Sequence, residues 1–159
     1  MITLAALRAA FVGIVDRHED GFTTTSEWTT ALDTTVESRT FPVCIWGPPR
    51  VVTTNDAPGR MHDTFLIDVL FLDQTPPDRT RDERDTVVSD MCDAARECFL
   101  QFHTENIKAS TTLDLSLVEG PTIEAVYDRA AEACSGVRMT FTVRDNAQPD
   151  CVDTHFDVS

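Results

Sequence analysis

The side chains that could do chemistry are four histidines, five cysteines and one aspartate within an apolar run. His18, His62, His103 and His155 are scattered, and none stands at the HxxxH spacing of a metal-binding helix. The cysteines form no CxxC pair and are odd in number, which argues against a zinc ribbon and a disulfide framework. The segment DTHFD (153–157) alternates possible metal ligands, a pattern that a polar tail produces by chance. Neither GxGxxG nor GxxxxGK[ST] is present, so a phosphate-binding loop is not indicated.

Asp68 is the best candidate for acid–base chemistry, because it lies in the apolar run TFLIDVLFLD. Burial would raise the pKa of its carboxyl group, as a general base requires. A small enzyme would need a pocket lined by groups such as Asp68, Tyr127 or His103. No partner for Asp68 is evident, however, and an ion pair at an interface accounts for it equally well. We therefore predict no catalytic residue, no cofactor site and no metal site.

Composition indicates one globular domain over residues 1–159, with 42% apolar and 25% charged residues. The start, MITLAALRAAFVGIVDRHED, lacks a basic region before its apolar part, so we expect a helix rather than a signal peptide. No apolar run is long enough for a membrane span. A formal net charge of −14 opposes nonspecific binding to phosphates. The acidic surplus either serves solubility in a salty setting or lets nucleic acid slide past.

Hydrophobic periodicity predicts the elements of the first half of the chain. A helix is expected over 3–17, with Thr3 as its cap, and a short helix begins at Ser26. A strand over 41–46 ends at the sequence GPP, and Val51 to Thr54 extends a strand. Residues 55–59 then form the tip of a projecting hairpin.

The most hydrophobic run is DTFLIDVLFLD (63–73), a strand whose two faces are both mainly apolar and must both be covered. The clearest helix begins at Thr80, which forms a capping box with Glu83, and its about 24 residues span roughly 36 Å. Its predicted buried stripe contains Val88, Met91, Cys92, Ala95, Cys98, Phe99 and Phe102.

The last third predicts two more strands. TTLDLSLVEG places three leucines inward, and GVRMTFTVRDN (136–146) alternates apolar residues with Arg138, Thr140, Thr142 and Arg144. Residues 124–134 have helical propensity but also fit an extended piece, a turn and a hairpin. Residues 147–159 are predicted to form an irregular tail.

Together these elements predict an α+β fold. A four-stranded antiparallel sheet would carry the N-terminal helix and the long central helix on one face, leaving the other face free.

This element order resembles that of the tail terminator (tail completion) proteins and related small neck proteins of long-tailed phages. TFLIDVLFLD, TRDERDTVVSDMCDAARECFLQF and IEAVYDRAAEACSGVRMTFTV carry the resemblance, which covers about residues 1–146 and rests on pattern and order. The strong acidity of the chain and the helical propensity of residues 124–134 depart from the family pattern.

The resemblance implies a structural virion protein, found in the neck or at the top of the tail and assembled in the host cytoplasm. Such proteins form rings, commonly hexamers, that cap the tail tube protein and join it to the head–tail connector or stopper protein. DNA passes through the centre without specific binding, and no membrane is involved.

On this resemblance, arginines of the free sheet face and of the hairpin would meet acids of a neighbouring copy, against the alternative of arginines solvated at the surface. The predicted interface residues are Trp46, Arg50, Arg60, Asp68, Arg138 and Arg144. Two other classes of protein remain open. One is an acidic cytoplasmic adaptor or secretion chaperone dimer that takes a client by strand addition. The other is a small enzyme without a cofactor.

Overall fold

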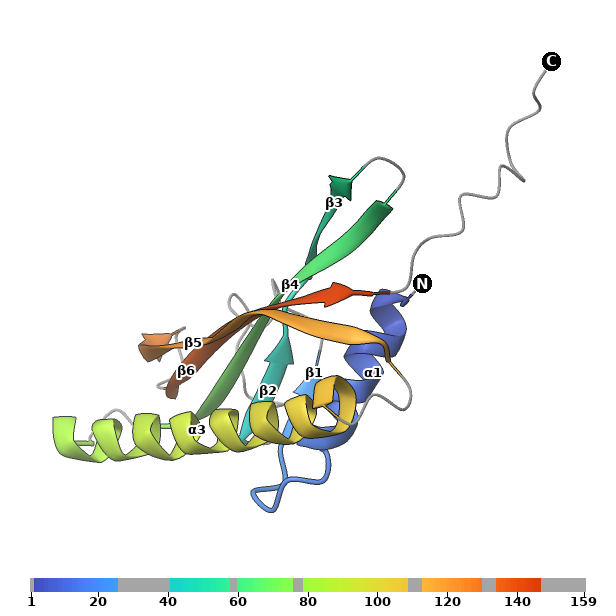
Figure 1. Ribbon diagram of the computed structural model, residues 1–159. Helices are drawn as coiled ribbons and strands as arrows, with labels where there is room; N and C mark the ends of the chain where they lie inside the picture. The colour runs from blue at the N-terminus through green and yellow to red at the C-terminus, as the bar shows by residue number, and fades with distance from the viewer. Residues whose placement is uncertain are drawn as a thin grey trace.

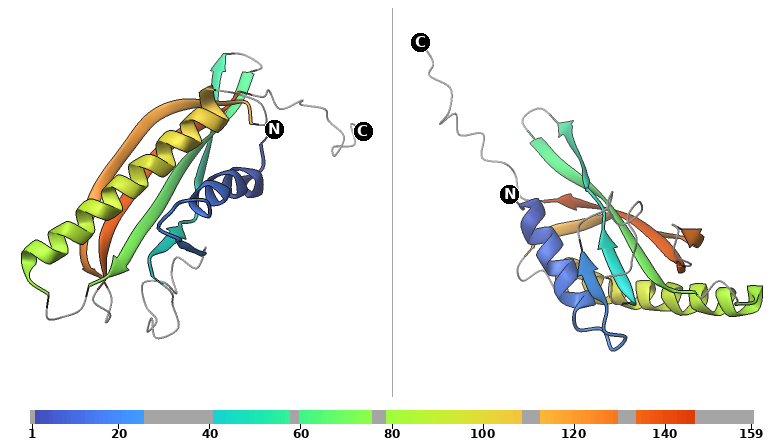
Figure 2. Two further views of the ribbon diagram at one scale, coloured as in Figure 1. Left: turned by 90° about the horizontal axis from the view of Figure 1, so that it is seen from below. Right: turned by 180° about the vertical axis from the view of Figure 1, so that it is seen from behind.

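The computed structural model describes residues 2–25, 41–57, 60–75, 79–108, 113–129 and 134–146. These residues form a mostly antiparallel six-stranded sheet with two α-helices on one of its faces (Figures 1 and 2). The predicted α+β class is confirmed. In chain order the elements are α1 (Leu4–Val15), β1 (Thr23–Thr25), β2 (Val43–Trp46), β3 (Arg50–Ala57), β4 (Arg60–Gln74), α3 (Arg81–Phe102), the π-helix η1 (His103–Lys108), β5 (Leu115–Arg129) and β6 (Cys134–Asp145).

The predicted number of four strands is wrong, because β1 and β3 are strands in their own right. β1 comes from the threonine run that follows Gly21 and pairs in parallel with β2. Three residues show no periodicity of their own, so this strand depends on its partner. The predicted short helix at Ser26 and the tail 147–159 lie outside the described residues.

β4 is the central strand, and the sheet order is β1-β2-β4-β6-β5, with β3 also paired to β4. β2 and β3 pair with successive parts of one edge of β4, so that Ile45 lies opposite Leu70 and Val51 opposite Phe65. β6 pairs along the other edge of β4 and carries β5 on its far side. β3 and β5 therefore lie at opposite sides of the sheet.

The predicted hairpin is confirmed as the β3–β4 hairpin, which protrudes from the body of the molecule (Figure 1). The ladder between β4 and β6 begins at Thr64, opposite Arg144, so residues 60–63 of β4 pair only with β3 among the described strands. The sheet thus narrows to two strands at this end.

The two helices pack on the same sheet face because each has one apolar stripe. In α1 the Thr3 hydroxyl accepts a hydrogen bond from the Ala6 N–H, as the predicted cap requires. In α3 the capping box of Thr80 and Glu83 is confirmed. Phe11 of α1 and Phe102 of α3 meet with ring centroids 5.6 Å apart, and both contact Phe141 of β6.

The buried stripe of α3 differs from the predicted one at four positions. Val87 and Ala94 are buried, whereas Val88 and Cys92 are half-buried. Compared with the prediction, the buried stripe is shifted around the helix toward α1. The side of α3 that lies next to β5 is therefore only half-buried. The remaining predicted members of the stripe are buried.

Residues 124–129 are extended, so the helical alternative fails for the part of this segment that the structure describes. Val126 lies opposite Gly136 of β6 and is 8% exposed. Cross-strand pairing and burial therefore outweigh helical propensity here. Position 136 requires glycine, because a Cβ atom there would lie 1.9 Å from the Phe71 carbonyl oxygen.

We expect Gly136→Ala to destabilise the fold strongly, because the added methyl would have to displace the backbone of β4. The free energy of unfolding should fall by about 3 kcal/mol or more, as in severe overpacking. Gly120→Ala is the matched control, because a Cβ there meets nothing within 4 Å. Urea unfolding of both variants measures the difference, and equal stabilities would contradict the close approach at Gly136.

Candidate subunit interface

The sheet face turned away from α1 and α3, here called the outer face, is only partly open. At one end it carries a second apolar cluster that is buried within a single copy. Its members are Val43, Ile45, Leu70, Leu72, Val126 and Cys134, each at most 8% exposed. The expectation of a wholly free face is therefore wrong. Exposure is concentrated at the sides of the sheet instead.

Asp68 and Arg138 form an ion pair with two hydrogen bonds on the outer face. Nε of Arg138 donates to Oδ1 of Asp68 at 2.8 Å, and a terminal guanidinium nitrogen donates to Oδ2. The hydrogen bond to Asp68 raises the pKa of Arg138, and the charges of Asp68 and Glu124 act in the same direction. Arg138 thus meets an acid of its own chain, which differs from the expectation that it meets a neighbour.

The other predicted interface residues lie in different places. Trp46 is 4% exposed and packs against Phe11, which leaves it almost no surface for a neighbour. Arg50 is exposed at the start of β3. Arg60 lies in β4 opposite Ala57, and Arg144 is half-buried on the outer face opposite Thr64. The structure therefore brings Asp68 and Arg138 together and places Arg50 and Arg60 on the hairpin.

The β3–β4 hairpin exposes apolar side chains on both of its strands. Val51, Val52 and Met61 are 41%, 48% and 41% exposed. Thr53 and Asp63 are joined across the hairpin by a hydrogen bond of 2.6 Å, which links the two strands through side chains as well as backbone. The hairpin is thus an apolar projection with Arg50 at its base.

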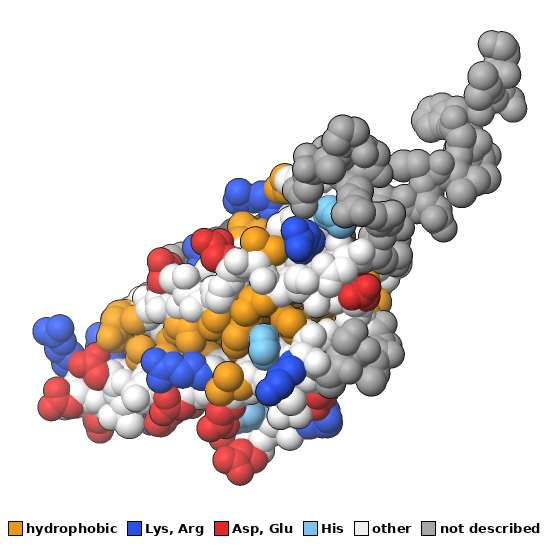
Figure 3. Space-filling view, viewed as in Figure 1, with side chains coloured by type: hydrophobic (Ala, Val, Ile, Leu, Met, Phe, Trp, Pro, Cys, Tyr) orange, Lys and Arg blue, Asp and Glu red, His pale blue; other side chains and the backbone are white. Residues whose placement is uncertain are grey.

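An apolar strip that sequence reasoning missed runs between α3 and β5. Figure 3 shows an orange band there, and Tyr127 of β5, a member of the strip, is 49% exposed. The Tyr127 hydroxyl donates to Asp85 of α3 at 2.9 Å, which raises the pKa of Tyr127. We define the apolar strip as Val88 and Cys92 of α3 with Leu117, Ile123, Ala125 and Tyr127 of β5.

The strip follows from helix and strand geometry. Val88 and Cys92 lie three and seven residues after Asp85, on the helix side that faces β5. Reading residues 117–127 as a strand would have revealed the alternation, which the helical propensity of residues 124–134 obscured.

β5 is an outer strand of the sheet, and among the described strands it pairs only with β6. Its ladder shifts register at three places, and Pro121 supplies no backbone N–H donor. Bulges and proline both hinder the addition of another strand. Such an edge is poorly suited to the client binding that the chaperone alternative requires.

A hollow of about 450 Å³ between α1 and α3 is the other candidate site. His18 and Cys98 both line it, and Nε2 of His18 lies 3.1 Å from a carboxylate oxygen of Glu97. Burial, reinforced by the charges of Glu97 and Asp20, raises the pKa of the Cys98 thiol to about 12. Cys98 is therefore a protonated thiol at neutral pH, which makes it a poor nucleophile.

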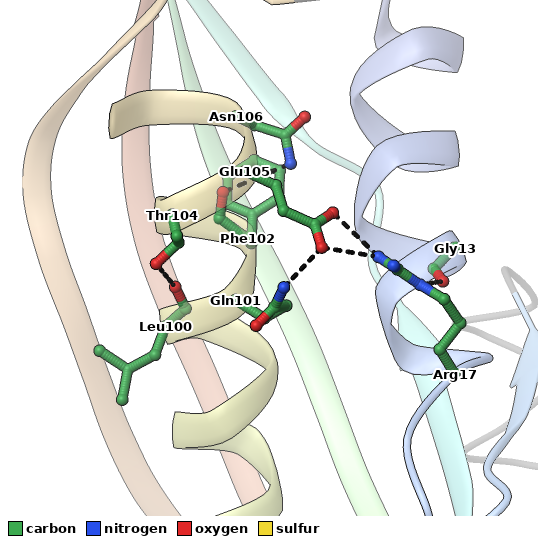
Figure 4. A network of polar contacts seen from close by, with 8 residues as sticks. All are labelled: Gly13, Arg17, Leu100, Gln101, Phe102, Thr104, Glu105 and Asn106. Carbon is green, nitrogen blue, oxygen red and sulfur yellow. Dashed lines mark hydrogen bonds and ion pairs between the residues drawn. The ribbon is translucent and has the colours of Figure 1, made fainter. Parts of the chain in front are cut away.

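Beside this hollow, an ion pair links the two helices, as Figure 4 shows. The Arg17 guanidinium donates to both carboxylate oxygens of Glu105 in η1, at 3.0 and 2.9 Å, and to the Gly13 carbonyl. Hydrogen bonds from Gln101 and Arg17 lower the pKa of Glu105. These polar groups beside the hollow therefore serve to link α1 to the end of α3.

The groups proposed for an enzyme do not converge. Asp68 lies on the outer face, whereas Tyr127 bonds α3 on the opposite face and His103 begins η1. Within the described ranges no group of three histidine, cysteine or acidic side chains could hold a metal ion. None of the helices described there has the length and apolar character to cross a membrane.

No family model and no curated protein matches the chain. The hairpin and the apolar strip are therefore the basis of a functional proposal.

Asp68→Asn should lower stability by about 1 kcal/mol, because it removes the charge that Arg138 pairs with on a partly buried face. Asp93→Asn is the control, since the pair of Asp93 with Arg96 is more than 60% exposed on both sides and should contribute almost nothing. Urea unfolding at neutral pH measures both. Equal losses for the two variants would contradict a structural role for the Asp68 pair.

Alkylation should distinguish the thiols. Burial raises the pKa of Cys44 and of Cys98, whereas Cys92 is half-buried on the apolar strip. Iodoacetamide at pH 8 should therefore label Cys92 more than about tenfold faster than Cys98 in the folded protein. Peptide mass spectrometry over time measures the rates, and equal labelling in urea is the control. A fast Cys98 would instead indicate a reactive thiol.

Proposed function

We propose that the chain is a structural protein of a tailed virus that assembles into a ring at the head–tail junction. The ring, commonly a hexamer in the family that the chain resembles, caps the tail tube and joins it to the connector or stopper protein. The observation that carries this proposal is the pair of exposed apolar surfaces, the hairpin and the strip, on opposite sides of one sheet.

Two different surfaces on opposite sides of a subunit favour a ring over a two-fold dimer. A two-fold dimer uses one patch that contacts its own copy, whereas a head-to-tail contact joins two unlike patches and closes into a ring. The hairpin is built from β3 and β4, and the strip from α3 and β5, with β6 between them. Each copy therefore has one surface for each of two neighbours.

The charge of the chain supports the passage of DNA through such a ring. With 27 acidic and 13 basic residues, the chain has few cations with which to displace the counterions of DNA. A channel of this composition does not hold phosphates, so DNA slides through it. The tube and connector partners, and the place in the virion neck, follow from the family resemblance alone.

We expect the purified chain of 17.7 kDa to form a ring with a central hole. Copies that each carry a charge of −14 repel one another, and salt shortens the range of this repulsion from about 10 Å at 0.1 M to about 3 Å at 1 M. Assembly should therefore strengthen as salt is raised. Light scattering after size exclusion gives the mass, and negative-stain electron microscopy shows the hole.

Two outcomes would contradict the ring. A stable dimer at every concentration would favour the adaptor or chaperone class. A monomer at every protein and salt concentration would remove the proposed assembly.

A further inference from the structure

We propose that the β3–β4 hairpin of one copy docks across the apolar strip of the next, with Arg50 of the hairpin paired to Glu119 of the strip's strand. This inference rests on the proposed ring, and it names the contact that closes it. In one copy β6 lies between the hairpin and β5, so the hairpin that docks on the strip belongs to a second copy.

The two surfaces divide their apolar and charged residues in the same way. Opposite partners in the ladder show that Arg50, facing Leu66, lies on the outer face, while Val51, facing Phe65, lies on the helix side. On β5, Glu119 faces Thr142 on the outer face, while Ile123 faces Met139 on the helix side. When the hairpin of one copy lies over the β5 edge of the next, Arg50 therefore faces Glu119 on the outer side. On the helix side, Val51 faces the apolar residues of the strip.

Arg50 and Glu119 are available for this contact. Both are exposed, and neither has an ion pair or side-chain hydrogen bond with another described residue. Glu124, the other exposed acid on this part of β5, already raises the pKa of Arg138 within the same copy. Charges of opposite sign on facing surfaces select the register of an interface and speed encounter.

The contact is made by side chains rather than by a continuous sheet. Pro121 and the register shifts interrupt the β5 edge, and β3 has an irregularity between Asn55 and Ala57. The β5 edge is therefore a poor template for backbone pairing. The exposed valines of the hairpin and the exposed residues of the strip offer apolar surface that burial would stabilise.

Charge reversal tests the pair. We expect Arg50→Glu and Glu119→Arg each to raise the concentration for half-assembly at least about tenfold, because a like-charge contact replaces a favourable one. The double variant should recover most of the wild-type assembly. Arg8→Glu, an exposed reversal on α1, is the matched control and should leave assembly unchanged beyond the shared change in net charge. Circular dichroism confirms that each variant is folded.

Two further measurements test the apolar part. Val51→Thr keeps the β-branched shape and should weaken assembly severalfold, whereas Leu100→Thr, also exposed but outside the strip, should not. In the wild type, iodoacetamide labelling of Cys92 should slow at least about fivefold on assembly, because docking covers the strip. In the unassembled protein, where the strip is uncovered, iodoacetamide should label Cys92 at the faster rate.

The outcomes separate this contact from the ring itself. If wild-type rings form but Arg50→Glu and Val51→Thr assemble normally, or Cys92 is labelled equally in both states, the docking proposal is overturned and the ring stands. If both single reversals weaken assembly and the double variant does not recover, the Arg50–Glu119 pair is overturned. If the wild type forms no ring, the proposed function fails first.

Discussion

The structure depends on β4, a strand that is paired along both edges and apolar on both faces. Phe65, Ile67, Val69 and Phe71 turn toward the helices, and Leu70 and Leu72 turn the other way. A backbone N–H or C=O group that is buried without a hydrogen-bond partner costs free energy, and so does a leucine side chain left exposed to water. Both edges of β4 therefore need partner strands, and both of its faces need to be covered. α1 and α3 cover one face of β4. The second cluster supplies part of the other, and Gly136 lets β6 approach where a side chain would not fit.

Once β4 is covered, the surfaces left exposed lie away from it. The hairpin extends past the end of the β4–β6 ladder, where Met61 is exposed, and Val51 and Val52 are exposed at its base, opposite Phe65 and Thr64. The buried stripe of α3 is turned toward α1, and the ion pair of Arg17 with Glu105 joins the two helices on that side. The opposite side of α3, next to β5, is only half-buried. The two candidate interface surfaces are thus consequences of how the core is closed, on one side by a long hairpin and on the other by the setting of one helix.

Much of this fold could be predicted from local patterns. The caps at Thr3 and Thr80, the alternation around Arg138 and the apolar run around Asp68 each identified an element, because periodicity and capping act over a few residues. β1 could not be found, since three threonines become a strand only through β2. Trp46 illustrates a different limit. It was predicted at an interface together with the arginines of the hairpin, but α1, whose Phe11 covers it, is distant in the chain.

The candidate site shows the same division. Asp68 and Arg138 were both identified as charges of interest, yet their pairing depends on the register between β4 and β6, in which Asp68 stands opposite Thr140 and Arg138 opposite Leu70. The apolar strip was missed because part of it lies on a helix and part on a strand of ambiguous propensity. Surfaces composed of two elements have no single period, so sequence reasoning does not detect them.

The charge of the chain and the form of its edges constrain how copies could meet. At −14 per copy, long-range repulsion opposes every approach, so a productive contact has to gain its stability at short range. Backbone pairing would supply this without selectivity, and the proline and bulges of β5 hinder it. Under the proposed docking, apolar burial with one matched pair of charges would supply this stability at a single register.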